Sequence, residues 1–200
     1  VFPFHFFPSL TSLHLNTPDF RPNWNLPKSL HLSALKSLFL QNVCFVTSDG
    51  NDFAEPFSTC VLLNTLVLGN FCLAKDVKVL RISNPNISSL SLHTWKEVDS
   101  YHIQLSAPKL SFLSIIDVDF SSSHQLSSTC NLTFLEEVHI DTYSDIYSPI
   151  ILNWLQLFSN VNKMTTSMAT FKSISDVSSF SFDFCIVSII FACLLQNIAC

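Results

Sequence analysis

The sequence predicts a solenoid of stacked repeats, in the α/β class, with a parallel β-sheet along its concave wall. Two observations predict this fold. The apolar pattern Leu-x-x-Leu-x-Leu occurs six times at nearly regular intervals, and a longer module of two extended segments occurs twice, 23 residues apart. A fixed period of this length is typical of repeat proteins, in which each repeat buries its apolar face only against its neighbours.

The first element of each repeat is a short strand, because the Leu-x-Leu half of the pattern alternates with a period of two. The last apolar residues stand at positions 15, 40, 68, 92, 115 and 140, so successive copies are 23 to 28 residues apart. This period is close to the ~20–29 residues of leucine-rich repeats. A seventh, weaker copy covers Val161 to Thr166. The six clear copies are Leu10–Leu15, Leu35–Leu40, Leu63–Leu68, Ile87–Leu92, Leu110–Ile115 and Leu135–Ile140.

The second element is an inward turn that follows each strand. A small polar residue stands two positions after the strand, where its side chain can hydrogen-bond the backbone of the turn. Three positions later an apolar residue is expected to fill the interior. The polar residues are Thr17, Asn42, Asn70, Thr94, Asp117 and Thr142. The apolar residues are Phe20, Phe45, Leu73 and Phe120.

The third element is a strand on the opposite, convex wall, predicted by the duplicated module. Residues 80–92 and 103–115 align at a constant offset of 23, and each copy holds two apolar segments separated by Ser-x-Pro. Proline lacks an N–H group and suits a corner between strands, so we expect Pro85 and Pro108 in turns. The convex side is therefore partly extended. The longer interval at residues 46–62 leaves room for a short helix near Pro56–Leu63.

The composition supports a folded chain and excludes several functions. Of the 200 residues, 48% are hydrophobic and only 12% are charged, about half the ~25% usual in soluble proteins, so disorder is excluded for most of the chain. The formal charge of −5, without a basic run, argues against nucleic-acid binding. Only two glycines occur, Gly50 and Gly69, which excludes a glycine-rich phosphate cradle.

The cysteines and histidines indicate neither a metal site nor catalysis. The seven cysteines contain no C-x-x-C pair, so the sequence indicates no zinc site. Because their number is odd, they cannot all pair in a closed disulfide framework, and we expect reduced thiols. Glu137 and His139 share one side of a strand, but no third ligand stands at metal spacing. No G-x-S-x-G motif marks a nucleophile. We therefore expect no enzyme activity, no metal and no cofactor.

The chain resembles the leucine-rich-repeat region of plant F-box proteins, including those with an FBD tail. The resemblance covers residues 8–172 and is carried by Leu26–Leu40 (LPKSLHLSALKSLFL), by Glu55–Cys60 (EPFSTC) and by the I-S-x-P modules. It implies the substrate-recognition part of an SCF-type ubiquitin ligase adaptor, located inside the cell. In that family the F-box docks on a Skp1-like adaptor while the repeats hold a target protein. The 200 residues show no F-box, so a Skp1-like partner is expected only if one lies upstream of Val1.

The chain divides into a repeat domain and a tail. Residues 1–172 form the predicted leucine-rich-repeat domain of about seven repeats, and residues 173–200 form a Ser-rich linker with an apolar end. Phe184–Leu195 is uncharged but shorter than the ~20 residues that span a bilayer, so membrane attachment is not favoured. A terminal cap and the end of a misread gene are the other interpretations, and we favour the last.

The candidate binding residues are the strand positions that face outward, because stacked solenoids bind partners on such surfaces. Exposed apolar groups at these positions suggest a contact patch, which singles out Phe39, Val67 and Ile116. The full set of candidate partner-binding residues is His14, Phe39, Val67, His93, Ile116 and His139.

The first functional hypothesis is a protein-protein interaction module that binds an unidentified target protein. A fragment of a membrane-attached leucine-rich-repeat receptor is the second hypothesis, which the sequons at Asn86 and Asn131 and the apolar tail would suit. A nonfunctional, truncated F-box remnant is the third.

Overall fold

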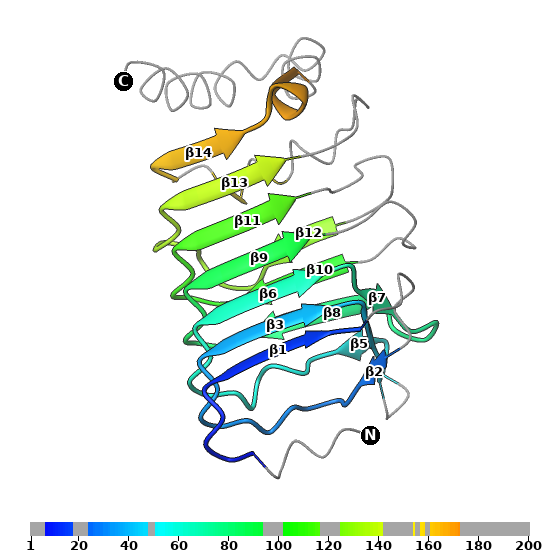
Figure 1. Ribbon diagram of the computed structural model, residues 1–200. Helices are drawn as coiled ribbons and strands as arrows, with labels where there is room; N and C mark the ends of the chain where they lie inside the picture. The colour runs from blue at the N-terminus through cyan, green and yellow to red at the C-terminus, as the bar shows by residue number, and fades with distance from the viewer. Residues whose placement is uncertain are drawn as a thin grey trace.

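The fold is that of a solenoid built almost entirely from parallel β-strands, as a computed structural model shows (Figure 1). One short helix, residues 168–172, follows the last strand. Because stacked coils place corresponding segments of the chain side by side, residues about 25 positions apart in the sequence are neighbours in space. The structure describes residues 7–17, 24–47, 51–93, 102–116, 125–141, 154, 157–158 and 161–172.

A seven-stranded parallel sheet forms one wall of the solenoid, in the order β1-β3-β6-β9-β11-β13-β14. All seven copies of the apolar pattern supply one strand each, which confirms the predicted repeat, its weak last copy included. The paired residues keep strict register, so that Leu38 lies between Leu13 and Leu66. The strands are β1 (Ser12–Asn16), β3 (Ser37–Gln41), β6 (Thr65–Gly69), β9 (Ser89–His93), β11 (Phe112–Ile116), β13 (Glu137–Asp141) and β14 (Lys163–Thr166).

The remaining strands form two smaller parallel sheets. One has the order β12-β10-β8-β5 and contains β5 (Phe53–Ala54), β8 (Val79–Ser83), β10 (His102–Ser106) and β12 (Gln125–Ser128). The other has the order β2-β4-β7 and contains β2 (Trp24–Leu26), β4 (Val43–Phe45) and β7 (Cys72–Leu73). The four-stranded sheet confirms the partly extended wall opposite the main sheet, whereas β4 and β7 of the three-stranded sheet begin shortly after β3 and β6 end.

The duplicated module folds as predicted. Its first strands, β8 and β10, pair in register, so that Leu80 lies beside Ile103 and Ile82 beside Leu105. Its second strands, β9 and β11, pair in the main sheet. Pro85 and Pro108 stand in the turns between the two walls, where a missing N–H group interrupts no strand pairing.

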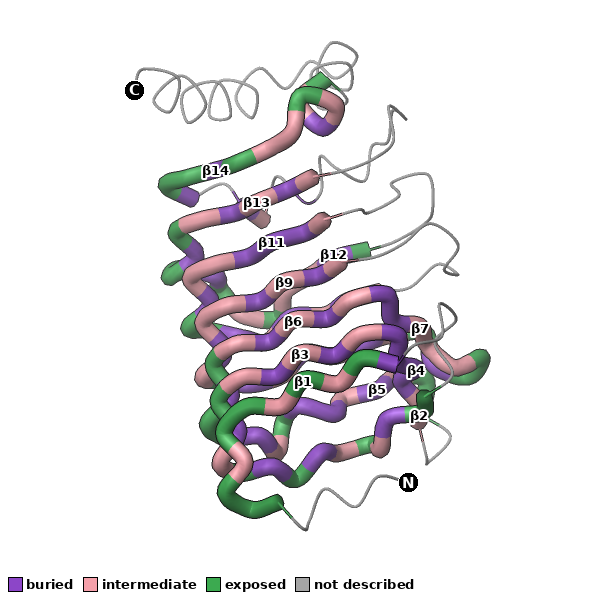
Figure 2. Tube along the Cα trace, in the orientation of Figure 1, coloured by how far each residue is buried: buried purple, intermediate pink, exposed green. Residues whose placement is uncertain are grey.

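The core lies between the walls and is filled by the inward-facing strand residues. Buried and partly exposed residues alternate along β3, β6, β9 and β13 (Figure 2), as the period of two requires, whereas Ser114 in the middle of β11 is also buried. Phe45 packs edge-on against the rings of Phe57 and Phe71, with ring centroids 5.9 and 5.7 Å apart. Because every coil contributes to one continuous core, no single repeat can be removed without exposing its neighbours.

The predicted helix near Pro56–Leu63 is wrong. This segment forms consecutive turns, in which the Cys60 N–H donates to the Phe57 carbonyl (3.1 Å) and the Leu63 N–H donates to the Cys60 carbonyl (2.9 Å). Phe57, Cys60 and Leu63 are all fully buried. Two tight turns place these side chains inward within a short length of chain. Strand β5, at Phe53–Ala54, lies just before them in the long interval of residues 46–62.

Several predictions concern residues outside the described part of the chain: those on Phe20, Thr94, Asp117, Phe120 and Thr142, on the tail 173–200 and on Cys185, Cys193 and Cys200. Within the described ranges, no helix is both long and apolar enough to cross a membrane. Cys44, Cys60, Cys72 and Cys130 are thiols, as expected from the sequence.

Replacing Leu66 by Ala should lower the free energy of unfolding by about 2–5 kcal/mol, because its fully buried side chain would leave a cavity between adjacent coils. Leu62→Ala is the matched control: Leu62 is 50% exposed, and its truncation should change stability by about 0.5 kcal/mol or less. Urea denaturation followed by circular dichroism measures both. Equal losses in the two variants would contradict the register of the core.

Candidate functional site

The outward face of the seven-stranded sheet arranges the strand side chains in straight rows, because all six pairings are parallel and in register. Two rows contain the candidate residues. The middle row consists of His14, Phe39, Val67, Ser91, Ser114, His139 and Thr165. The end row, at the carboxyl ends of the strands, consists of Asn16, Gln41, Gly69, His93, Ile116 and Asp141.

A pocket of about 270 Å³ opens on this face over the first four strands of the sheet. It exists because the end row has a gap: Gly69 carries no side chain and stands between Gln41 and His93. We call this hollow the Gly69 pocket. Its lining residues are His14, Phe39, Leu40, Gln41, Val67, Gly69 and His93.

Aromatic and aliphatic groups form one side of the Gly69 pocket, and polar groups form the other. The rings of His14 and Phe39 lie 5.5 Å apart at a tilt of 43°, and Val67 continues the middle row beside Phe39. Gln41 and His93 supply an amide and an imidazole from the end row. The lining contains no Asp, Glu, Lys or Arg, so the pocket suits an apolar group that carries an uncharged hydrogen-bonding atom.

The backbone at Gly69 would accept a side chain. A Cβ atom built there would stand 3.4 Å from Gln41 Cγ and 3.8 Å from Gln41 Cβ, which are ordinary contacts with a flexible side chain. Gly69 lies within strand β6. A Cβ atom therefore fits at this position without moving the backbone, and a larger side chain would extend into the Gly69 pocket beside Gln41, whose flexible side chain can move aside.

The turns that follow the pocket residues are held by a ladder of buried polar side chains. The Asn42 side-chain amide donates to the Thr17 carbonyl (2.7 Å), and the Thr17 hydroxyl donates to the Asn42 carbonyl (2.9 Å). The Asn70 side-chain amide in turn donates to the Asn42 side-chain oxygen. These bonds confirm the prediction that polar residues after the strands bind the turn backbone for Thr17 and Asn42, whereas the Asn70 amide binds the Asn42 side chain.

The ladder also fixes the ends of the strands that line the pocket. The Asn42 backbone N–H donates to the Gly69 carbonyl (3.0 Å), and the Asn70 backbone N–H donates to the His93 carbonyl (2.7 Å). Asn42 and Asn70 both adopt left-handed backbone conformations, with φ of 58° and 46°. Asparagine tolerates this conformation better than most residues, which adds a backbone reason for its presence after these strands.

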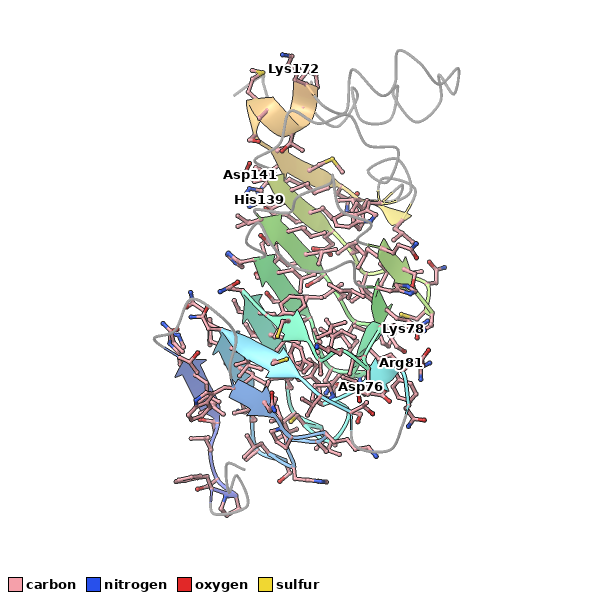
Figure 3. The ribbon with its side chains drawn as sticks, turned by 90° about the vertical axis from the view of Figure 1, so that its right-hand side faces the viewer. Asp76, Lys78, Arg81, His139, Asp141 and Lys172 are labelled. Carbon is pink, nitrogen blue, oxygen red and sulfur yellow. The ribbon has the colours of Figure 1, made fainter. Side chains whose placement is uncertain are left out.

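The structure brings four of the six candidate residues together. His14, Phe39, Val67 and His93 line the Gly69 pocket. Ile116 follows His93 in the end row, and His139 lies in the middle row two strands beyond Ser91, so both share the face without lining the pocket. Figure 3 shows His139 and Asp141 on one side of the molecule and Lys78 and Arg81 on the opposite side.

Gly69 was not among the predicted site residues, although its position in the repeat pattern distinguishes it. Gly69 is one of only two glycines, and it occupies an outward strand position where every neighbouring repeat has a side chain. Gln41, which also lines the pocket, was not among the six candidate residues.

No cluster of three or more His, Cys, Asp or Glu side chains suited to a metal ion occurs among the described residues. The Glu137 carboxylate, next to His139 on the sheet, forms an ion pair with Lys163 on the adjacent strand (Nζ–Oε1 2.7 Å). This pair is largely exposed and contributes little to stability.

Comparison with known proteins adds no family: this chain matches no protein-family model, no curated protein and no solved structure.

Two substitutions of Asn42 should separate the contribution of its side-chain hydrogen bond from that of its left-handed backbone conformation. Asn42→Gly keeps the left-handed backbone but leaves the buried Thr17 carbonyl without its amide donor, which should cost about 1–3 kcal/mol of stability. Asn42→Ala loses the same bond and also strains the backbone, so it should be less stable than the glycine variant by about 1 kcal/mol. Urea denaturation of the three proteins measures both steps. Equal stability of the two variants would show that the backbone conformation contributes nothing.

Proposed function

We propose that this chain is a protein-protein interaction module that recognises a partner on the outward face of its seven-stranded sheet. The Gly69 pocket carries the proposal, because it gathers apolar and polar side chains from four separate coils at one point of that face. An extended face of a solenoid with one concave anchor point suits a protein partner, in which a few side chains provide most of the binding energy.

The size and charge of the Gly69 pocket indicate what enters it. Its 270 Å³ lies below the ~300–1,000 Å³ of sites that enclose whole small molecules, and it suits one side chain of a partner protein. The rings of His14 and Phe39 favour an aromatic side chain, and Gln41 and His93 can bond a polar atom at its tip. A tyrosine side chain meets these requirements, whereas a cationic one would lose its hydration without gaining a carboxylate partner in the lining.

The resemblance to plant F-box proteins extends the proposal to a biological role. On that basis the chain is the target-binding part of an SCF-type ubiquitin ligase adaptor inside the cell, and it catalyses no reaction itself. The segment Leu26–Leu40, which carries part of the resemblance, contains Phe39 and Leu40 of the Gly69 pocket. A target protein held there would be presented for ubiquitination by the other subunits of the ligase.

Selection of random peptides displayed on phage should enrich sequences with a shared aromatic residue, because one aromatic side chain would anchor each peptide in the Gly69 pocket. Gly69→Leu should reduce binding of the selected peptides at least tenfold, measured by fluorescence anisotropy, because the new side chain fills the pocket. Thr165→Leu is the matched control: it adds the same side chain to the same face on β14, outside the pocket, and should leave binding unchanged. No enrichment, or equal binding by Gly69→Leu, would overturn the proposal.

Sequencing the transcript upstream of Val1 tests the ligase role separately. The expected result is an in-frame F-box, and a protein that includes it should capture a purified Skp1-like adaptor in a pull-down. A signal peptide at that place would instead indicate the membrane-attached receptor. A transcript with neither segment would refute the ligase role while leaving peptide binding by the repeats to stand on its own test.

A further inference from the structure

We propose that Cys44 and Cys72 form a redox modification site, at which a small disulfide such as glutathione disulfide oxidises the two thiols to one intramolecular disulfide bond. This inference is independent of the proposed binding function. It rests on the placement of the two cysteines in the three-stranded sheet and on the unequal surroundings of their side chains.

Cys44 and Cys72 are direct neighbours across paired strands. Strands β4 and β7 run parallel, and their register sets Cys44 beside Cys72 and Phe45 beside Leu73. Neighbouring strands lie about 4.8 Å apart, within the ~4.4–6.8 Å between Cα atoms that a disulfide requires. Residues at the same register point to the same side of a sheet, so the two side chains lie next to each other.

The two thiols are not equivalent. The Cys44 residue is only 8% exposed, whereas Cys72 is more accessible to solvent. The hydrogen bond to Cys72, and then burial, raise the pKa of the Cys44 thiol well above its usual range. Negative charge at Cys72 and at Asp76 raises this pKa further, so Cys44 stays protonated. Because Cys72 is the more exposed of the two, the disulfide reagent reaches it first, which makes Cys72 the attacking sulfur and Cys44 the resolving one.

The reaction is an ordinary pair of thiol–disulfide exchanges. The Cys72 thiolate attacks one sulfur of glutathione disulfide, which forms a mixed disulfide and releases one glutathione thiolate. Cys44 then attacks the Cys72 sulfur and gives up its proton, which forms the Cys44–Cys72 bond and releases the second glutathione. The protein loses two electrons and two protons, and glutathione disulfide gains them as it becomes two glutathione thiols.

The other described cysteines lack this arrangement. Cys60 is fully buried in the turns between the walls, where burial raises the pKa of its thiol. Cys130 follows strand β12, and its sulfur lies 3.6 Å from the Ser128 hydroxyl. Within the described residues, no other two cysteines are paired across neighbouring strands. Oxidation should thus be selective for one pair and should link the second coil to the third.

The test treats the reduced, folded 200-residue chain with glutathione disulfide, alkylates the remaining thiols and maps the peptides by mass spectrometry. Trypsin cuts after Lys36 and Lys75, and Asp-N protease cuts before Asp49 and Asp52, so residues 37–48, with Cys44, separate from residues 52–75, with Cys60 and Cys72. After treatment with glutathione disulfide, we expect a disulfide to join these two peptides in the digest without reductant. Adding reductant should release them as separate peptides. Alkylated Cys44 in every sample, or glutathione retained on Cys72, would overturn the proposal.

Three variants identify the partner of Cys44. The linked peptides should persist in Cys60→Ala and disappear in both Cys44→Ala and Cys72→Ala. Circular dichroism of each variant confirms that it is folded, and Cys72 is the safer position because its side chain is not fully enclosed. A linkage that survives Cys72→Ala would assign the bond to Cys60 and refute the Cys44–Cys72 site.

Discussion

The register between successive coils is the constraint on which the rest of the structure depends. Neighbouring strands of the seven-stranded sheet are joined only by the long chain segment of one coil. The register of each strand is therefore set by backbone pairing and by the buried residues beneath it. Leu38, Leu66 and Leu90 lie in one line at full burial, and a slip of one residue would turn such leucines to solvent. The same alignment gathers side chains from distant repeats into straight rows on the outer face.

The Gly69 pocket is a direct result of this alignment. In an isolated strand, a glycine flanked by Leu68 and Asn70 would form no cavity. It forms one here because the neighbouring strands place Gln41 and His93 at the same level, on either side of a missing side chain. The asparagine ladder follows the end row and fixes the carboxyl ends of the strands. These hydrogen bonds hold the backbone positions from which the lining side chains of the pocket extend. A pocket preorganised in this way loses little conformational freedom when a partner binds.

Much of the fold could be predicted because a solenoid converts a sequence period directly into a spatial one. The Leu-x-Leu strands, the Ser-x-Pro corners and the polar residues at the turns all follow from local rules that repeat along the chain. The structure of Pro56–Leu63 could not be predicted in this way, because the segment occurs in only one long repeat. Its turns depend on the burial of the Phe57 and Cys60 side chains in the core. A helix and a run of turns satisfy the same apolar spacing over so short a stretch.

The binding face was predictable as a surface but not as a pocket. Alternation identifies outward positions such as Phe39 and Val67, but a cavity depends on which absent side chain falls between which neighbours. The aligned repeats already place Gln41 directly after Leu40 and Gly69 directly after Leu68, but the sequence alone does not show how the surrounding side chains lie around the glycine. Cys44 and Cys72 likewise stand at equivalent positions after Leu40 and Leu68, but only the structure shows that strands β4 and β7 form there and pair.

The most direct test of the central claim is an NMR titration of the protein with p-cresol, the side-chain analogue of tyrosine. If the gap at Gly69 is a side-chain pocket, p-cresol should shift the amide signals of Val67 and Gly69 with saturation at millimolar concentration, and Gly69→Leu should abolish those shifts while Thr165→Leu retains them. Absent shifts in the unmodified protein, or the same shifts in Gly69→Leu, would contradict the claim that this gap recognises a partner.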